Sequence, residues 1–313
     1  MAESSDEIER GAHVTACGRV MAVGLILAAT LTAAACAPST PDGLRKPTPT
    51  TAPAESTTVN SAVPRPSHVV VVILENHGTE QVSGNSQAPY LNELAAAGAR
   101  FTDATAITHP SQPNYLALFS GDPQGVTDDS CPHTFSGPNL ARQLIDAGYR
   151  FGAFAEDLPG PGYPGCRFGD YVRWHAPWVD FTTVPAVVNQ PFTAFGPNYT
   201  RLPTLSFVIP DMCHDMHDCD ITTGDSWLRA HLGDYADWAA THNSLLVVTF
   251  DEAEDASATN GIPLSLTGPM IRPGTYAEPV DHYRLLRTLE AMYGLPALGN
   301  AADAKPITDV WRT

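Results

Sequence analysis

The sequence predicts an α/β fold with a mainly parallel sheet covered by helices on both faces. Continuous apolar, β-branched runs are typical of strands buried on both faces, and four occur, at residues 68–74, 151–155, 205–209 and 244–250. Helical patterns lie between these runs, and strands that alternate with helices favour parallel pairing. No internal repeat interrupts this order, so we expect one α/β domain.

The helices are predicted from apolar residues that recur on one face. The expected segments are residues 89–98 (Leu91, Leu94, Ala95), residues 139–147 (Leu140, Leu144, Ile145), a stripe of Leu228, Leu232, Tyr235 and Ala239, and a stripe of Leu285, Leu286, Leu289 and Met292. Residues 156–204 are different, because they are dense in Pro, Gly and aromatic residues. We expect them to form a long excursion over the active face.

The N-terminal region has the features of an export signal. Residues 21–35 are apolar but too short to span a bilayer, and they end in small residues before Cys36. This pattern indicates a lipoprotein signal with Cys36 as the lipidated residue; an ordinary signal peptide cut nearby is the alternative. We therefore expect a leader at 1–36, a Pro/Thr-rich tether at 37–66, a catalytic domain at 67–313, and a monomer exported to the cell surface or secreted.

The number of cysteines in the predicted exported part agrees with export. Without Cys17 and Cys36 four remain, and an even number in an exported chain indicates two disulfides. Three pairings can be drawn; we favour Cys131 with Cys166 and Cys213 with Cys219, because each pair brackets a candidate site loop.

The composition excludes one class of partner. The chain has 17 Lys and Arg against 34 Asp and Glu, a formal net charge of −17, and no basic cluster. Such a surface repels phosphate backbones, so nucleic-acid binding through a basic face is excluded.

Acidic and amide side chains follow the predicted strands. Glu75 and Asn76 come after the first strand, Asp251 and Glu252 after the last, and residues 211–218 (DMCHDMHD) after the third. Ligands of open α/β sheets bind at the carboxyl ends of the strands. Acids gathered there repel one another unless a cation neutralises them, and oxygen donors favour Ca²⁺, Mg²⁺ or Mn²⁺. Solvated loop acids are the alternative.

Ser111 lies at the predicted start of a helix, within residues 108–115 (THPSQPNY). A helix N-terminus favours an anion. An N-cap role for Ser111 remains open, but a cap does not account for Asn114 and His109 in the same turn.

Six blocks carry a resemblance to a known family. They are VVVVILENHG, THPSQPNYLALFSG, GAFAED at 152–157, DMHD at 215–218, NSLLVVTFDE and HYRLLRTLEAMYGLP at 282–296. In this order they resemble the bacterial phosphoesterase family, which contains secreted acid phosphatases of the SapM type and phospholipases C. The resemblance covers residues 67–311 and implies an alkaline-phosphatase-like three-layer α/β/α sandwich with a bound metal.

The resemblance implies roles for single residues. Glu75, Asn76, Asp251 and Glu252 would be metal ligands, and Ser111 would be the nucleophile. His217 would be the proton donor or a phosphate contact. His282 matches a late histidine of the family, and we count it among the expected catalytic residues. We expect Asn114 and His109 to hold the phosphate oxygens. Structural roles for His217, His282 and His214 are the alternatives.

The expected activity is metal-dependent hydrolysis of a small phosphate monoester through a phosphoserine. Phospholipase C members follow the Asp-Glu pair with His-Gly-Gly and have Arg after Glu-Asn, whereas this chain has residues 253–255 (AED) and His77 there. A phospholipase C or phosphodiesterase, with a groove lined by Phe168, Tyr171, Trp174, Trp178 and Phe181, is the first alternative. A non-catalytic, ligand-binding lipoprotein is the second. The sulfatase motif C-x-P-x-R, G-x-S-x-G and H-E-x-x-H are absent.

Overall fold

A computed structural model describes residues 63–254 and 257–312. Twelve strands are described: β1 (His68–Leu74), β2 (Ala99–Phe101), β3 (Ala104–Thr105), β4 (Phe151–Ala155), β5 (Arg167–Phe168), β6 (Tyr171–Val172), β7 (Asn189–Pro191), β8 (Leu205–Ile209), β9 (Ser244–Phe250), β10 (Leu264–Thr267), β11 (Gly274–Tyr276) and β12 (Val280–Asp281). The α-helices among the described residues are α1 (Thr79–Val82), α2 (Pro89–Ala97), α3 (Ser111–Ser120), α4 (Leu140–Asp146), α5 (Ile221–Ala239) and α6 (His282–Tyr293).

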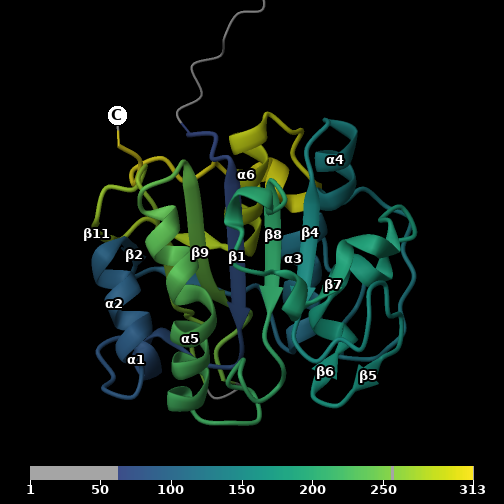
Figure 1. Cartoon of the computed structure of the whole chain (residues 1–313), viewed down its shortest axis with the longest axis horizontal. Coiled ribbons are helices and arrows are strands. Elements are labelled where there is room, and N and C mark those ends of the chain that lie inside the picture. The colour runs from purple at the N-terminus through teal and green to yellow at the C-terminus, as the bar shows by residue number, and fades with distance from the viewer. Residues whose placement is uncertain (1–62, 255–256, 313) are drawn as a thin grey trace, which may run out of the picture. The chain divides into compact units, whose positions relative to one another are not determined.

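The central sheet has eight strands in the order β11-β2-β10-β9-β1-β8-β4-β7. The five strands from β9 to β7 run parallel, and β10 is antiparallel to both of its neighbours. Figure 1 shows α2 and α5 on one face of this sheet and α3 and α6 on the other. The three-layer α/β/α arrangement expected from the sequence is therefore confirmed.

The strand predictions agree with the structure because these runs are buried along nearly their whole length. The four predicted ranges coincide with β1, β4, β8 and β9, and every residue of β4, β8 and β9 is buried. Helix α3 begins at Ser111, where the sequence analysis places the start of a helix. All ten residues of α3 are buried, including the polar residues of its first turn.

The predicted excursion at 156–204 contains little regular structure. It forms the short pair β5–β6, the edge strand β7 and several single-turn 3₁₀ segments, η1 (Arg173–His175), η2 (Pro177–Asp180), η3 (Ala186–Val188), η4 (Phe192–Ala194) and η5 (Tyr199–Arg201). A further 3₁₀ turn, η6 (Gly299–Asp303), follows α6. Strand β7 pairs with β4, so part of the excursion extends the central sheet.

Two predicted disulfides are confirmed. Cys131 is bonded to Cys166, and Cys213 is bonded to Cys219. The second bond closes the loop after β8, and this loop packs directly on α5. A Cβ atom at Gly224 would lie 2.4 Å from Met216 Cγ and 2.7 Å from the carbonyl oxygen of His214. Only glycine allows this helix and this loop to approach so closely.

The described chain makes contacts from Val63 onward, four residues before the expected domain start. Val63 is buried, Arg65 Nε donates to the carbonyl of Met292 at 3.3 Å, and the Tyr293 hydroxyl donates to the carbonyl of Pro66 at 3.2 Å. The predicted leader, Cys36 and residues 37–62 of the tether lie outside the described residues. Within the part of the chain that is described, no helix has the length and apolarity to cross a membrane.

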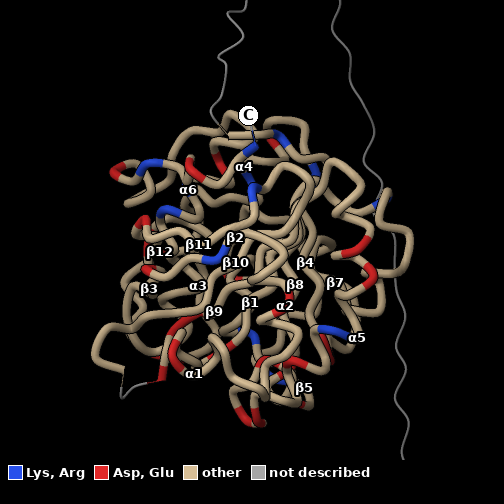
Figure 2. The backbone as a smooth tube through the Cα atoms, turned by 90° about the vertical axis from the view of Figure 1, so that its left-hand side faces the viewer, with Lys and Arg blue, Asp and Glu red and all other residues tan. Residues whose placement is uncertain are grey.

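Charge is distributed unevenly along the tube in Figure 2. The lower end, around α1 and β5, carries more acidic than basic positions. This end coincides with the carboxyl ends of the parallel strands in Figure 1.

Candidate active site

Acidic residues follow four neighbouring parallel strands at one edge of the sheet. Glu156 follows β4, Asp211 begins the loop after β8, Glu75 follows β1, and Asp251 follows β9. Leu74 pairs with Phe250, so Glu75 and Asp251 leave their strands at the same level. The expectation that the sheet would gather distant acids at this edge is met by the geometry.

Glu75 is fully buried between three groups. Its Oε2 accepts a hydrogen bond from Ser111 Oγ at 3.1 Å, while Oε1 accepts one from the Tyr115 hydroxyl. His175 Nε2 lies 3.3 Å from the same Oε1. The two carboxylate oxygens of Glu75 thus face different neighbours.

Ser111 is buried as the first residue of α3, and its hydroxyl points at carboxylates. Besides Glu75 Oε2, it lies 3.4 Å from Glu252 Oε1 in hydrogen-bonding geometry. Its own side chain does not cap the helix, because the cap residue is Pro110. The N-cap alternative for Ser111 is therefore wrong, and its hydroxyl remains among acids.

Asn76 turns the chain so that the ends of β1 and β9 meet. It has φ of 53°, in the left-handed region that asparagine tolerates better than most residues. In this conformation its backbone N–H donates to Asp251 Oδ1 at 3.3 Å, while Asp251 N–H donates to the Leu74 carbonyl at 3.0 Å. Asp251 and Glu252 are both buried.

Asn114 and His109 both contact Glu252. Asn114 Nδ2 donates to Glu252 Oε2 at 3.3 Å and to the carbonyls of Thr108 and Pro110, while its Oδ1 accepts the N–H groups of Ile107 and Thr108. His109 Nδ1 lies 2.8 Å from Glu252 Oε2, and about a third of the His109 side chain is exposed. In this structure both residues hold Glu252 and the turn before Ser111.

The two histidines expected in catalysis occupy different environments. The His217 side chain is partly exposed, its Nδ1 lies 2.8 Å from Asp218 Oδ1, and its ring centre lies 6.5 Å from that of His175. His282 is buried at the start of α6, where Nε2 lies 2.5 Å from the backbone carbonyl of Asp251. Its geometry is that of a residue which positions the Asp251 backbone. His217 has the access to solvent that a proton donor to substrate requires.

Burial shifts the pKa values of the ionisable groups at this site. It raises the pKa of Glu75 well above its ordinary value, and the neighbouring charges of Asp251 and Asp215 raise it further. Burial likewise raises the pKa of Asp215 well above its usual range, and that of Asp251 to about 7. The same loss of hydration lowers the pKa of His175 well below its ordinary value.

The donor set fits a divalent cation. Glu75 and Glu252 bring buried carboxylate oxygens to the Ser111 hydroxyl. Asp251 is buried at the end of the neighbouring strand, and its Oδ2 has no hydrogen-bond partner. Buried polar atoms are normally paired, and buried carboxylates that repel one another are stabilised by a cation. Oxygen donors of this kind suit Mg²⁺, Ca²⁺ or Mn²⁺. Among the described residues, Asn76 meets these acids through its backbone N–H, which donates to Asp251 Oδ1.

The sequence pattern of a known family covers most of these residues. The pattern described as the phosphoesterase family matches residues 83–296, which include Ser111, Asp215, Asp251 and Glu252. The chain belongs to the phosphoesterase family. Members of this family hydrolyse phosphoric ester bonds, and this chain is a hydrolase of that class.

Two relatives of this phosphoesterase illustrate the range of the family. The chain is 52% identical over 254 residues to a phosphatidylinositol-3-phosphatase of Mycobacterium tuberculosis, an alignment that covers 80% of this chain and 85% of that protein. It is 34% identical over 227 residues to a phosphate-repressible acid phosphatase of Penicillium chrysogenum, covering 67% of this chain and 55% of that protein. The chain thus spans little more than half the length of this fungal relative.

Solved structures support the fold. A protein of the alkaline phosphatase superfamily from Vibrio parahaemolyticus superimposes with a TM-score of 0.57 at 14% identity, covering 79% of this chain and 72% of that chain. The alkaline-phosphatase-like architecture expected for the phosphoesterase is therefore confirmed.

Three residues of this phosphoesterase site were not predicted. Asp215 stands in the acidic loop after β8, whose composition was the available signal, but its spacing did not distinguish it from Asp211 or Asp218. Tyr115 lies in an apolar helical segment, so the sequence pattern indicates a core residue and not a site residue. His175 lies in the aromatic excursion, where no periodicity exists, and only the folded chain brings it beside Glu75.

Proposed function

We propose that this phosphoesterase is an exported, divalent-metal-dependent phosphomonoesterase that forms a phosphoserine on Ser111. The observation that carries the proposal is the position of the Ser111 hydroxyl, 3.1 Å from Glu75 Oε2 and 3.4 Å from Glu252 Oε1. A buried serine surrounded by acids has no evident structural purpose, but it is suited to attack a phosphorus atom held by a cation on those acids.

The cation would be held by Glu75, Asp251 and Glu252, with Asn76 as the fourth predicted ligand. When bound, it would polarise a phosphoryl oxygen and lower the pKa of the serine hydroxyl. His109 and Asn114 keep Glu252 in place through the contacts described above. The exposed part of the His109 ring is the group we expect to reach an equatorial phosphate oxygen.

The proton donors and acceptors around Ser111 suggest the order of the steps in the proposed reaction. Ser111 Oγ attacks phosphorus and passes its proton to a neighbouring carboxylate oxygen, the Glu75 or Glu252 atom that already accepts its hydrogen bond. The P–O bond to the alcohol breaks, and His217 donates a proton to the departing oxygen. Water next attacks the phosphoserine and gives a proton back to His217. The carboxylate returns its proton to Ser111 Oγ, and inorganic phosphate leaves.

The substrate class follows from the surroundings of the site. Three of the five aromatic residues expected to line a lipid groove, Tyr171, Trp178 and Phe181, are buried in the core. This favours a monoester that enters with its phosphate first, rather than a phospholipid diester. Because one relative is a phosphatidylinositol-3-phosphatase, we include the phosphorylated inositol headgroup among the proposed substrates.

Two disulfides among the described residues support export, since disulfides persist in oxidising compartments. A lipid on Cys36 and a monomeric state remain part of the proposal. Incorporation of a palmitate label into wild type but not into Cys36→Ser would test the anchor.

The central experiment measures phosphate release from p-nitrophenyl phosphate and from a water-soluble short-chain phosphatidylinositol 3-phosphate, before and after EDTA. We expect Ser111→Ala to lower turnover at least about a thousand-fold, because loss of a nucleophile removes the covalent route. EDTA should abolish turnover, and Mg²⁺, Ca²⁺ or Mn²⁺ should restore it.

Ser120→Ala is the matched control, because Ser120 is a buried serine at the other end of the same helix. Undiminished turnover in Ser111→Ala would exclude the proposed nucleophile, and turnover that resists EDTA would exclude the cation. Faster release of phosphocholine from phosphatidylcholine than of phosphate from either monoester would instead assign the chain to the phospholipase C branch.

A further inference from the structure

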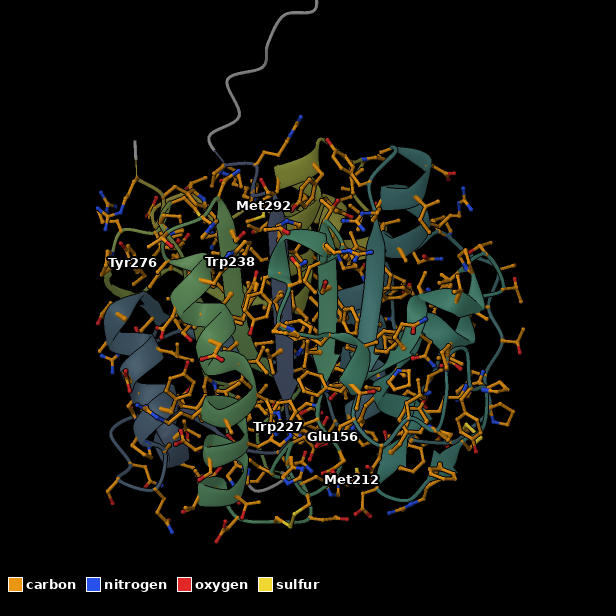
Figure 3. All side chains as sticks on the ribbon, viewed as in Figure 1. Glu156, Met212, Trp227, Trp238, Tyr276 and Met292 are labelled. Atoms are coloured by element: carbon orange, nitrogen blue, oxygen red, sulfur yellow. A yellow bond between two sulfur atoms is a disulfide. The ribbon has the colours of Figure 1, made fainter. Side chains whose placement is uncertain are left out.

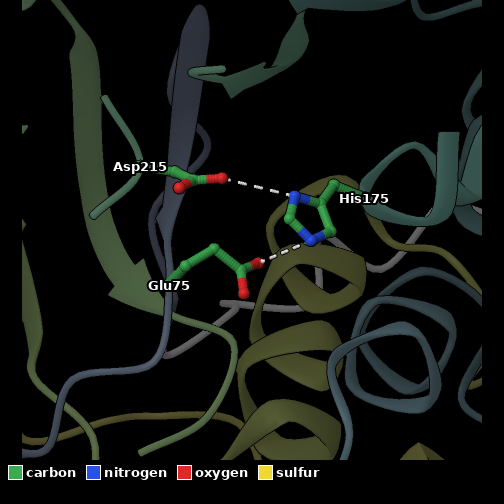
Figure 4. Close-up of side chains that lie close together, drawn as sticks. All are labelled: Glu75, His175 and Asp215. Atoms are coloured by element: carbon green, nitrogen blue, oxygen red, sulfur yellow. Dashed lines mark ion pairs between the residues drawn. The ribbon is translucent and has the colours of Figure 1, made fainter. Parts of the chain in front are cut away.

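The acids at the carboxyl edge are supported by side chains from different elements. Glu156, which follows β4, accepts a hydrogen bond from Trp227 Nε1 at 2.8 Å, and Figure 3 shows the two residues close together at the lower end of the sheet. Glu75, which follows β1, lies beside His175, and this ring stands between Glu75 and Asp215 in Figure 4. Side chains from α5 and from the excursion thus lie against the acids that follow β4 and β1.

The acid on the β9 side must be placed against the serine from another part of the chain. Ser111 begins α3 after the turn at residues 108–110, whereas Glu252 lies on the loop after β9, and 3.4 Å separates Ser111 Oγ from Glu252 Oε1. His109 and Asn114 contact the carboxylate of Glu252. The backbone that carries this carboxylate needs a separate link to the turn before Ser111.

The side chain of Asn260 joins the two loops. Its Oδ1 accepts the N–H of Ala253, the residue after Glu252, at 2.9 Å. Its Nδ2 donates to the carbonyl of Thr108, three residues before Ser111, also at 2.9 Å. One amide group therefore fixes the backbone beside Glu252 relative to the turn that presents Ser111.

The backbone of Asn260 is itself fixed. Its carbonyl accepts the N–H of Ala106 at 2.9 Å, and the next residue, Gly261, forms a β-bridge with Thr105 at the end of β3. Asn260 has φ of 49°, in the left-handed region that asparagine tolerates better than most residues. The position requires both this conformation and a side chain that offers a donor and an acceptor, and asparagine provides the combination.

We propose that Asn260 is a positioning residue for phosphoryl transfer, which keeps Glu252 Oε1 within reach of the Ser111 hydroxyl. It acts through the backbone of Ala253 and Thr108. A misplacement of about 1 Å at reacting groups can lower a rate about 100-fold, so a link of this kind is worth as much as a direct contact. The proposal rests on the proposed function, because it gives Asn260 a part in the attack by Ser111.

The test compares Asn260→Gly with wild type in the full chain. Glycine adopts a φ of this sign without strain, so the variant retains the backbone conformation and loses the two side-chain hydrogen bonds. With p-nitrophenyl phosphate, we expect kcat to fall about 100-fold while KM stays nearly unchanged, because the lost alignment matters in the transition state. Near-ultraviolet circular dichroism establishes that the fold is intact.

Inhibition by vanadate is the readout that general structural damage would not change. Vanadate can take the five-coordinate geometry of phosphoryl transfer when a hydroxyl oxygen binds it, so its affinity reports how well Ser111 is aligned. We expect its inhibition constant to rise by about the factor by which kcat falls, while that of inorganic phosphate stays the same. A partly unfolded preparation would instead lose kcat with an unchanged inhibition constant for vanadate.

Gln124→Gly is the matched control. Gln124 also has a positive φ, of 60°, and its Nε2 donates to Ser120 Oγ at 3.1 Å, at the other end of α3 from Ser111. This variant should keep the kcat and the vanadate inhibition of wild type.

Wild-type kcat in Asn260→Gly would overturn the proposal, as would a lower kcat with unchanged inhibition by vanadate. An equal loss in Gln124→Gly would overturn it as well, because the effect would then not depend on the link between the two loops. Failure of the proposed function is a separate result, since it is scored by phosphate release from Ser111→Ala.

Discussion

Glu75 and Asp251 leave adjacent parallel strands at the same level, although 176 positions separate them in the chain. The N–H of Asp251 donates to the carbonyl of Leu74, and the N–H after Glu75 donates to Asp251 Oδ1. Backbone pairing therefore forces two buried carboxylates together. Their mutual repulsion is the physical reason to expect that this edge of the sheet binds a cation.

Replacement of Asp251 should weaken metal binding without lowering the stability of the metal-free fold. Asp251→Asn keeps the shape of the side chain but removes a buried charge, so the metal-free variant should melt no lower than metal-free wild type. Loss of an outer-sphere partner already weakens metal affinity 10–100-fold, so loss of a proposed ligand should weaken it at least about 100-fold. Melting curves with and without Mg²⁺ or Mn²⁺ measure both effects.

Asp170→Asn is the control for that experiment, because Asp170 is an exposed acid near the same edge. It should keep the full metal-dependent rise in melting temperature. An equal rise in Asp251→Asn would show that Asp251 takes no part in binding the cation.

Asp225 should stabilise the fold without affecting the reaction. Its carboxylate, on α5, accepts the N–H groups of Tyr90 at 3.0 Å and Leu91 at 2.8 Å, at the start of α2. Asp225→Ala leaves both donors buried without an acceptor, which should lower the free energy of unfolding by about 2 kcal/mol.

Urea unfolding of Asp225→Ala measures this loss, and exposed Asp234→Ala on the same helix is the control. Turnover of p-nitrophenyl phosphate should be unchanged in both variants. A stability equal to that of wild type in Asp225→Ala would mean that the two N–H groups find other acceptors.

Glu290 should make stability depend on pH. Burial raises the pKa of this α6 side chain from 4.5 to about 7 in the folded protein. The folded state then holds a proton that the unfolded state has lost, so stability is full below pH 4.5 and falls as pH rises through 7. A shift of this size corresponds to roughly 2–3 kcal/mol, with allowance for its contacts with Arg287 and Leu298.

Glu290→Gln removes that titration, so the difference in unfolding free energy between wild type and variant should change by this amount between pH 4.5 and 7.5. Comparison at each pH cancels the titration of the acids at the active site. A difference that stays constant across this range would show that Glu290 is already ionised in the folded protein.

The two disulfides should contribute unequally. Cys131 and Cys166 are 35 positions apart, whereas Cys213 and Cys219 are 6 apart. Loop-closure entropy predicts that the longer loop contributes about 4 kcal/mol and the shorter about 2 kcal/mol. Urea unfolding of the two double Cys→Ser variants measures both, and an equal loss from each would contradict the entropic account.

Much of the fold follows from local patterns in the sequence. The runs that form β1, β4, β8 and β9 are so apolar that only fully buried strands could accommodate them. Because parallel strands end at one edge, the sequence also predicts that Glu75, Asp251 and Glu252 lie close together. The predicted cysteine pairing, in which each disulfide brackets a candidate site loop, agrees with the structure.

The tertiary structure decided which side chains complete that edge. His175 stands in a stretch without periodicity, 100 positions from Glu75, and reaches it only because the excursion folds back over the strand ends. The position of His282, on the backbone of Asp251 rather than toward a substrate, depends on how α6 packs behind the sheet. Local sequence determines which segments must be buried, because burial depends on the chemistry of each segment. Contacts between distant segments depend on how their surfaces fit together, which is a property of the whole chain.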